Sequence, residues 1–137
     1  MDWKLELVLL PVADPDRSKE FYVDTLGFNL DVDHDMGDFR VIQCTPPGSA
    51  CSITFGRGMP VGNPGDVKGT HLVVDDIEAA LAFLDEKGVE HGWIVHFEEG
   101  GPQPGADPEH RDYNSFIYFD DPDGNSWAVQ EVRRQSS

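Results

Sequence analysis

Five histidines are the side chains in this sequence best suited to acid–base chemistry near neutral pH, because an unperturbed imidazole titrates there. His71 is the strongest of them, since it lies in a short apolar segment that ends at Asp75-Asp76. It could act as a general base or as a polar anchor for a ligand. The simpler alternative is a hydrogen-bonded histidine at the edge of a sheet.

A second group of candidates surrounds residues 98–112, which are rich in Gly, Pro and acids and are predicted to form a long loop. His96 precedes this loop and could reach a binding site. Arg111, near the end of this loop, and Tyr113, directly after it, could fold over a ligand as a lid. In the alternative interpretation, Arg111 pairs with a carboxylate and fixes the loop. Of the other three histidines, His34 and His91 are expected to be exposed, and His110 lies near the end of the loop.

Other chemistry has little support in the sequence. Cys44 and Cys51 flank a predicted turn without the spacing of a zinc or redox motif, so we expect free thiols. We find no glycine-rich phosphate loop, no supported Ser/His/Asp constellation and no paired catalytic carboxylates. Trp93 and Trp127 are expected in the core.

The elements that must position these residues repeat along the chain. A strand over residues 4–12 leads to Asp14, a predicted helix N-cap, and the helix ends at Gly27. The second half repeats this pattern with a strand over 70–74, a cap at Asp75-Asp76 and a helix that ends at Gly88. The remaining predicted strands cover residues 28–35, 39–45, 51–55, 93–97, 115–119 and 126–132.

The repeat predicts one domain of two modules, residues 4–57 and 68–132, joined by a linker over 58–67. One helix can cover only one face of each module's sheet, so the other face stays bare. Two modules can cover each other's bare faces and enclose a cleft, which is a usual place for a ligand.

In order and at repeat spacing, these motifs resemble the vicinal oxygen chelate superfamily, which contains glyoxalases, bleomycin-resistance proteins and extradiol dioxygenases. The resemblance implies an α+β fold of two βαβββ modules, with a U-shaped mixed sheet around a cleft and helices on the outer face. It also implies a homodimer. The residues that carry it are Leu10-Pro-Val-Ala-Asp14, Arg17, Phe21-Tyr22, Leu26-Gly27-Phe28, His71 to Ile77 and Asp121-Pro-Asp-Gly-Asn125.

Enzymes of this superfamily hold a divalent metal with inward-facing His and Glu side chains. In this chain Leu7, Gly69 and Ala128 occupy three of those ligand positions, and none has a side chain that binds metal. Strand alternation places Glu131 on the helix side. We therefore expect no metal and no other cofactor. The alternative is a displaced site around His71.

The same alternation predicts that His71 and Gln130 are polar anchors in an apolar pocket. Leu7, Leu9 and Ala128 would line that pocket. His96, Arg111 and Tyr113 complete the set of predicted ligand-binding residues, and His71 is the one candidate for catalysis.

The charge of the chain limits its partners. The 10 basic and 26 acidic residues among 137 give a net charge of −16, which repels nucleic acids and anionic membrane surfaces. No apolar run approaches the roughly 18 residues that span a membrane, and no signal peptide is recognised, so a soluble cytoplasmic protein is expected.

Three functions follow from these features. The favoured one is a bleomycin-resistance-like protein that binds a small hydrophobic or cationic organic molecule in the cleft without metal. The second is a metal-dependent lyase or dioxygenase with a displaced site. The third is a scaffold or regulatory domain without catalysis.

Overall fold

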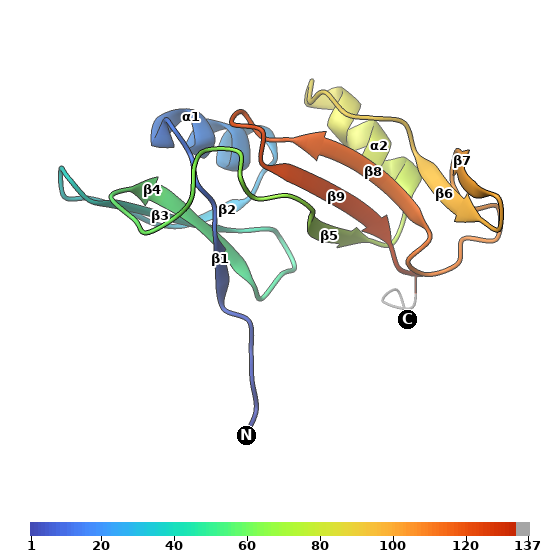
Figure 1. Ribbon diagram of the computed structural model, residues 1–137, viewed down its shortest axis with the longest axis horizontal. Helices are drawn as coiled ribbons and strands as arrows, with labels where there is room; N and C mark the ends of the chain where they lie inside the picture. The colour runs from blue at the N-terminus through green and yellow to red at the C-terminus, as the bar shows by residue number, and fades with distance from the viewer. Residues whose placement is uncertain (134–137) are drawn as a thin grey trace. The chain divides into compact units, whose positions relative to one another are not determined.

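A computed structural model describes residues 1–133, which form two compact units. The first unit contains residues 1–67 together with the turn at residues 121–125. The second contains residues 68–120 and 126–133. Each unit is built from one sheet and the helix that packs on it (Figure 1).

The first unit is a four-stranded sheet in the order β1-β4-β3-β2. β1 runs parallel to β4, and the other neighbours are antiparallel. The helical segment between β1 and β2 packs on this sheet. The elements are β1 (Leu7–Leu9), α1 (Pro15–Lys19), its π-helical continuation η1 (Glu20–Thr25), β2 (Asn29–Asp35), β3 (Arg40–Thr45) and β4 (Ser52–Arg57).

The second unit is a five-stranded sheet in the order β5-β9-β8-β6-β7. β5 runs parallel to β9, as β1 does to β4, and α2 packs against β8 and β9. The elements are β5 (Thr70–Val74), α2 (Ile77–Glu86), β6 (Val95–Glu98), β7 (Gly101–Pro104), β8 (Ser115–Asp120) and β9 (Ser126–Glu131).

The predicted α+β fold of two βαβββ modules is confirmed, with one addition. Residues 98–112 are not entirely loop, because β7 pairs with β6 inside this segment. β7 contains Pro102 and Pro104, residues that a central strand excludes. It lies at the edge of the sheet, where a missing N–H costs no ladder hydrogen bond.

The two helices begin and end as the repeat predicts. The carboxylates of Asp14 and Asp76 accept hydrogen bonds from the first backbone N–H groups of α1 and α2. Gly27 and Gly88 follow the helices with φ of 81° and 71°, a conformation that favours glycine. The π-helical turn η1 has no signal in the sequence.

Each unit has its own core on the helix side of its sheet. In the first, the ring of Tyr22 packs against Phe28 and Phe55 at centroid distances of 5.7 and 5.5 Å. In the second, Trp127 is buried and stacks on Phe119. The prediction of a buried Trp93 is wrong, since this side chain is 85% exposed.

Within residues 1–133, no helix has the length and apolar character needed to cross a membrane. The helices are short, and each packs on a sheet, which leaves the opposite face of that sheet without a helical cover.

Candidate functional site

The face of the second sheet away from α2 carries the predicted polar anchors. His71 lies opposite Ala128, and Val73 lies opposite Gln130, in the parallel pairing of β5 and β9. Paired residues point to the same face of a sheet. The predicted strand alternation is therefore confirmed, and His71, Ala128 and Gln130 share what we call the second open face.

Three aromatic side chains extend the second open face across β8 and β6. The registers place Tyr118 opposite Ala128, and Phe116 opposite both Gln130 and Val95. The ring of Phe116 stacks on Tyr118 at 6.2 Å and meets Phe97 edge-on at 5.7 Å. Tyr118 and Phe97 are exposed.

The predicted lining lacks these aromatic residues, although the sequence contains a signal for two of them. Phe116 and Tyr118 alternate within strand 115–119, so both must lie on one face. Which face they share depends on the pairing of β8 with β9, and that register is not visible in either strand alone.

His71 is exposed, and its ring is held by its own strand. Its Nδ1 lies 2.6 Å from the carbonyl oxygen of Gly69. A carbonyl only accepts, so Nδ1 must carry the proton. In the neutral ring Nε2 is therefore an acceptor.

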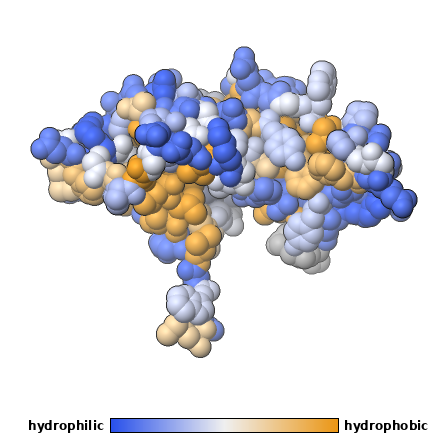
Figure 2. Space-filling model, viewed as in Figure 1, coloured by the Kyte–Doolittle hydropathy of each residue, from blue (hydrophilic) through white to orange (hydrophobic). Residues whose placement is uncertain are grey.

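The corresponding face of the first sheet carries Leu7 and Leu9. Their register partners on β4 are Ser52 and Thr54, and Gln43 on β3 also lies opposite Thr54. These five residues define the first open face. Figure 2 shows apolar surface over β1 and its neighbours in this unit.

Thr54 is distinctive on the first open face because its side chain is 4% exposed and its Oγ1 has no hydrogen-bond partner. Among residues 1–133 it is the one buried side-chain polar atom of this kind. A buried hydroxyl without a partner costs free energy.

His96 lies on the other side of the second sheet. It pairs with Ser115, whereas its neighbour Val95 pairs with Phe116 of the second open face. The ring is buried, and its Nδ1 lies 2.8 Å from the carbonyl oxygen of Gly105. The structure therefore does not bring His96 together with His71.

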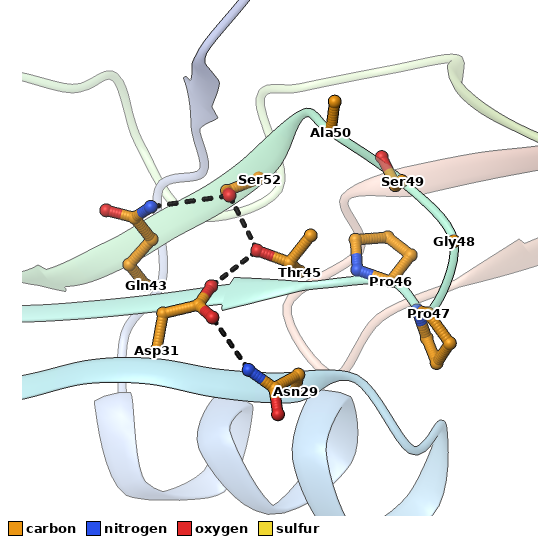
Figure 3. A pocket seen from close by; sticks show the side chains of 10 residues that line it. All are labelled: Asn29, Asp31, Gln43, Thr45, Pro46, Pro47, Gly48, Ser49, Ala50 and Ser52. Atoms are coloured by element: carbon orange, nitrogen blue, oxygen red, sulfur yellow. Dashed lines mark hydrogen bonds between the residues drawn. The ribbon is translucent and has the colours of Figure 1, made fainter.

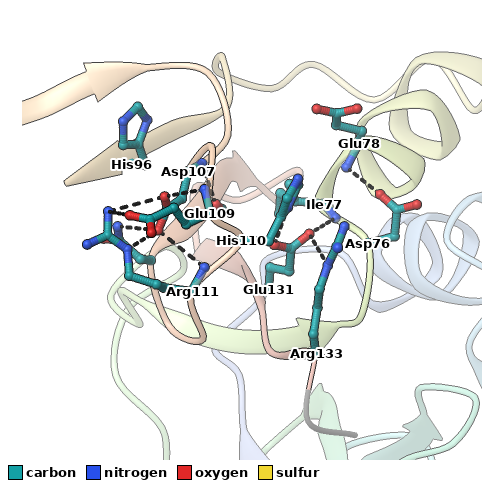
Figure 4. Close-up of polar contacts among 12 residues, drawn as sticks. Asp76, Ile77, Glu78, His96, Asp107, Glu109, His110, Arg111, Glu131 and Arg133 are labelled. Carbon is teal, nitrogen blue, oxygen red and sulfur yellow. Dashed lines mark hydrogen bonds and ion pairs between the residues drawn. The ribbon is translucent and has the colours of Figure 1, made fainter. Parts of the chain in front are cut away.

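Arg111 forms an ion pair with a carboxylate, which was the alternative to a role as a lid. Its Nε donates to Oδ2 of Asp107 at 2.7 Å, and its Nη2 donates to Oδ1 at 3.2 Å (Figure 4). This guanidinium and the Asn114 amide hold the pKa of Asp107 well below its usual range. Tyr113 is exposed, and its backbone N–H donates to the carbonyl oxygen of Glu131.

Glu131 decides whether the second sheet offers a carboxylate to a metal. Its side chain is fully buried on the α2 side, where Oε2 accepts the N–H of Ile77 at 2.9 Å (Figure 4). Its Oε1 lies 2.9 Å from Nδ1 of His110, and Arg133 is also nearby. Glu131 thus caps α2 and does not point to the second open face.

The donor set does not fit the divalent metal that the superfamily's enzymes hold. Leu7 and Ala128 present only hydrocarbon, and Gly69 has no side chain. His71 offers one imidazole and Gln130 one amide among the residues that define the second open face. Across the described residues, no three His, Cys, Asp or Glu side chains gather as a metal site requires.

The comparisons with known proteins agree with this fold. The family model of the Glyoxalase/Bleomycin resistance protein/Dioxygenase superfamily matches residues 4–129. The chain belongs to this superfamily. A solved structure of a superfamily member from Streptomyces sp. CB03234 is 30% identical, with a TM-score of 0.70, and the match covers 93% of this chain and all of that one.

One more solved structure and one sequence relative extend the comparison. TnmS3 of Streptomyces sp. CB03234, described as an antibiotic binding protein, is 29% identical with a TM-score of 0.73, over 95% of this chain and 96% of that one. Protein YetH of Bacillus subtilis (strain 168) is 22% identical over 126 residues, which are 90% of this chain and 94% of YetH.

Proposed function

We propose that this superfamily member binds a small organic molecule with an aromatic or hydrophobic part, neutral or cationic, and that it does so without a metal. One observation carries the proposal: the aromatic row of Phe97, Phe116 and Tyr118 on the second open face, in which Phe97 and Tyr118 are exposed. A planar ligand can stack on such a row, and stacking contributes about 1 kcal/mol beyond the area that it buries.

Polar groups beside the aromatic row would orient that ligand. Nε2 of His71 and the Gln130 amide supply a few hydrogen-bonding atoms within an apolar surface, which is the usual composition of a small-molecule site. The net charge of −16 favours neutral and cationic molecules over anions. The description of TnmS3 as an antibiotic binding protein supports the same class of function.

The metal-free part of the proposal rests on donor chemistry. A lone imidazole with an amide is a poor ligand set for a divalent ion, so a lyase or dioxygenase reaction on a chelated substrate has no support in these side chains. Elemental analysis of protein purified without chelator or affinity metal tests this. Stoichiometric Fe, Mn, Ni or Zn that is lost in His71→Ala would contradict it.

Binding is tested with three planar probes of different charge: 9-aminoacridine, 1-naphthol and 1-naphthalenesulfonate. We expect calorimetry to detect the cationic and the neutral probe but not the anion. Tyr118→Ala should weaken binding by about fivefold, since it removes one stacking surface. Phe83→Ala on α2 is the matched control, because Phe83 is 40% exposed and Tyr118 is 46% exposed.

Two results would reject this function. Absence of binding by all three probes favours the scaffold or regulatory alternative. Equal weakening by Tyr118→Ala and Phe83→Ala shows that the aromatic row is not the site.

The proposal keeps the expectation of a cytoplasmic homodimer with no nucleic-acid or membrane partner. Light scattering coupled to size-exclusion chromatography measures the mass in solution against the 15.2 kDa of one chain. A mass of one chain at all concentrations would remove the dimer from the proposal.

A further inference from the structure

The first unit contains an open hollow of about 450 Å³ beside the turn between β3 and β4 (Figure 3). Its walls include Asn29 and Asp31 from β2, Gln43 and Thr45 from β3, and Ser52 from β4. Ser52 lies opposite Leu7 in the pairing of β4 with β1, so the hollow adjoins the apolar part of the first open face.

The hydrogen bonds in the hollow run in one direction, toward Asp31 (Figure 3). The Thr45 hydroxyl donates to Oδ2 of Asp31, which uses its single proton. The 2.7 Å contact between Thr45 and Ser52 must then be donated by Ser52. Nε2 of Gln43 donates to the Ser52 oxygen at 3.3 Å. Neither hydroxyl keeps a proton for a ligand.

Asp31 differs from the other acids of its strand because it has no basic partner among residues 1–133. Asp33 is paired with Lys19 and Arg40, and Asp35 lies near Arg57. A β-bulge between Leu30 and Val32 shifts the register of β2, and the contact with Thr45 shows that Asp31 faces the hollow.

We propose that the hollow binds a protonated amine on a hydroxylated ligand, such as an amino sugar. Both carboxylate oxygens of Asp31 accept hydrogen bonds from neutral groups, Oδ1 from Asn29 and Oδ2 from Thr45, and no cation of the described chain balances the charge. The complementary group is therefore a positively charged donor. The inference goes beyond the proposed function, because the hollow lies in the first unit, whereas the aromatic row lies in the second.

Glucosamine and N-acetylglucosamine test the hollow directly, since they share a sugar ring and differ in whether the nitrogen is charged. Titration into ¹⁵N-labelled protein should shift the amide signals of residues 29–31 and 43–52 with glucosamine. N-acetylglucosamine should bind at least about tenfold more weakly, because its amide cannot form the charge-assisted hydrogen bonds.

Three variants identify the group responsible. Asp31→Asn should weaken glucosamine binding by about tenfold, whereas the matched control Asp35→Asn removes the same charge from the same strand and should leave it unchanged. Ala50→Lys places a competing cation on the exposed turn that lines the hollow, and it should abolish binding with the carboxylate intact.

Equal effects of Asp31→Asn and Asp35→Asn would overturn the proposal, because they would show general attraction to an acidic protein. Equal binding of the two sugars would also overturn it. Neither sugar has an aromatic ring, so failure here leaves the binding of 9-aminoacridine and 1-naphthol to the second open face unaffected. Failure of those probes with normal glucosamine binding would instead reject the proposed function alone.

Discussion

The buried hydroxyl of Thr54 on the first open face should lower the stability of the protein, because it has no hydrogen-bond partner. Thr54→Val keeps the shape of the side chain and removes a polar group that has no partner. We expect it to raise the free energy of unfolding by about 1 kcal/mol. Thr45→Val is the control, because the Thr45 hydroxyl bonds both Asp31 and Ser52 and its loss should destabilise. Urea unfolding measures both, and stabilisation by both variants would contradict the account.

Asp33 sets the acid sensitivity of the first unit. Hydrogen bonds from Arg40 and Lys19 hold the pKa of its carboxyl well below the ordinary value. A carboxyl whose pKa is lower in the folded than in the unfolded state stabilises the fold fully above the unfolded pKa, near 3.9. This contribution decreases progressively as pH falls from there toward the folded pKa. Asp33→Asn should therefore be less stable than the parent at pH 7, and the difference should shrink at pH 3. A constant difference in urea unfolding at both pH values would refute this.

At the scale of the element, the repeat predicts where the helices begin and end. A helix cap depends only on residues within a few positions of it in the sequence. Asp76 accepts the N–H groups of Glu78 and Ala79 at 3.0 and 3.2 Å. Asp76→Ala should lower the free energy of unfolding by about 1 kcal/mol. Asp75→Ala removes the same charge one residue earlier, where no cap bond forms in the described structure, and it should change stability far less. Thermal unfolding compares them, and equal losses would mean that charge alone acts.

The features that the sequence did not reveal are those that depend on the pairing between strands, such as register and bulges. The alternation of Leu30 and Val32 with acids predicts one regular strand, whereas the bulge places Asp31 toward the hollow and leaves Asp33 with Arg40. Trp93 reads as a core residue from its type, but it lies outside every strand of the second sheet and is exposed. Register and bulges arise from contacts between strands, so local composition does not encode them. His71, Ala128 and Gln130 were correctly placed on one face because alternation within a strand is local.

At the scale of the whole molecule, the 10 basic residues can neutralise only part of the 26 acidic ones, which leaves the net charge of −16. The basic residues Arg40 and Arg111 each form close pairs with carboxylates on their own unit. The remaining excess of acids must repel itself in the folded state, where the acids are closer together than in the unfolded chain. Repulsion among the acids therefore destabilises the folded state, and added salt should weaken that repulsion.

Raising NaCl from 0.01 to 0.1 M shortens the Debye length from about 30 to about 10 Å. We expect the melting temperature at pH 7 to rise, because screening weakens repulsion among distant acids more than it weakens the close ion pairs of Arg40 and Arg111.

CaCl₂ at the same ionic strength should raise the melting temperature by a similar amount, since the described residues contain no cluster of metal ligands. A much larger rise in CaCl₂ that disappears in Asp31→Asn would show that the hollow binds the ion itself. A fall in NaCl would show that close ion pairs outweigh the long-range repulsion.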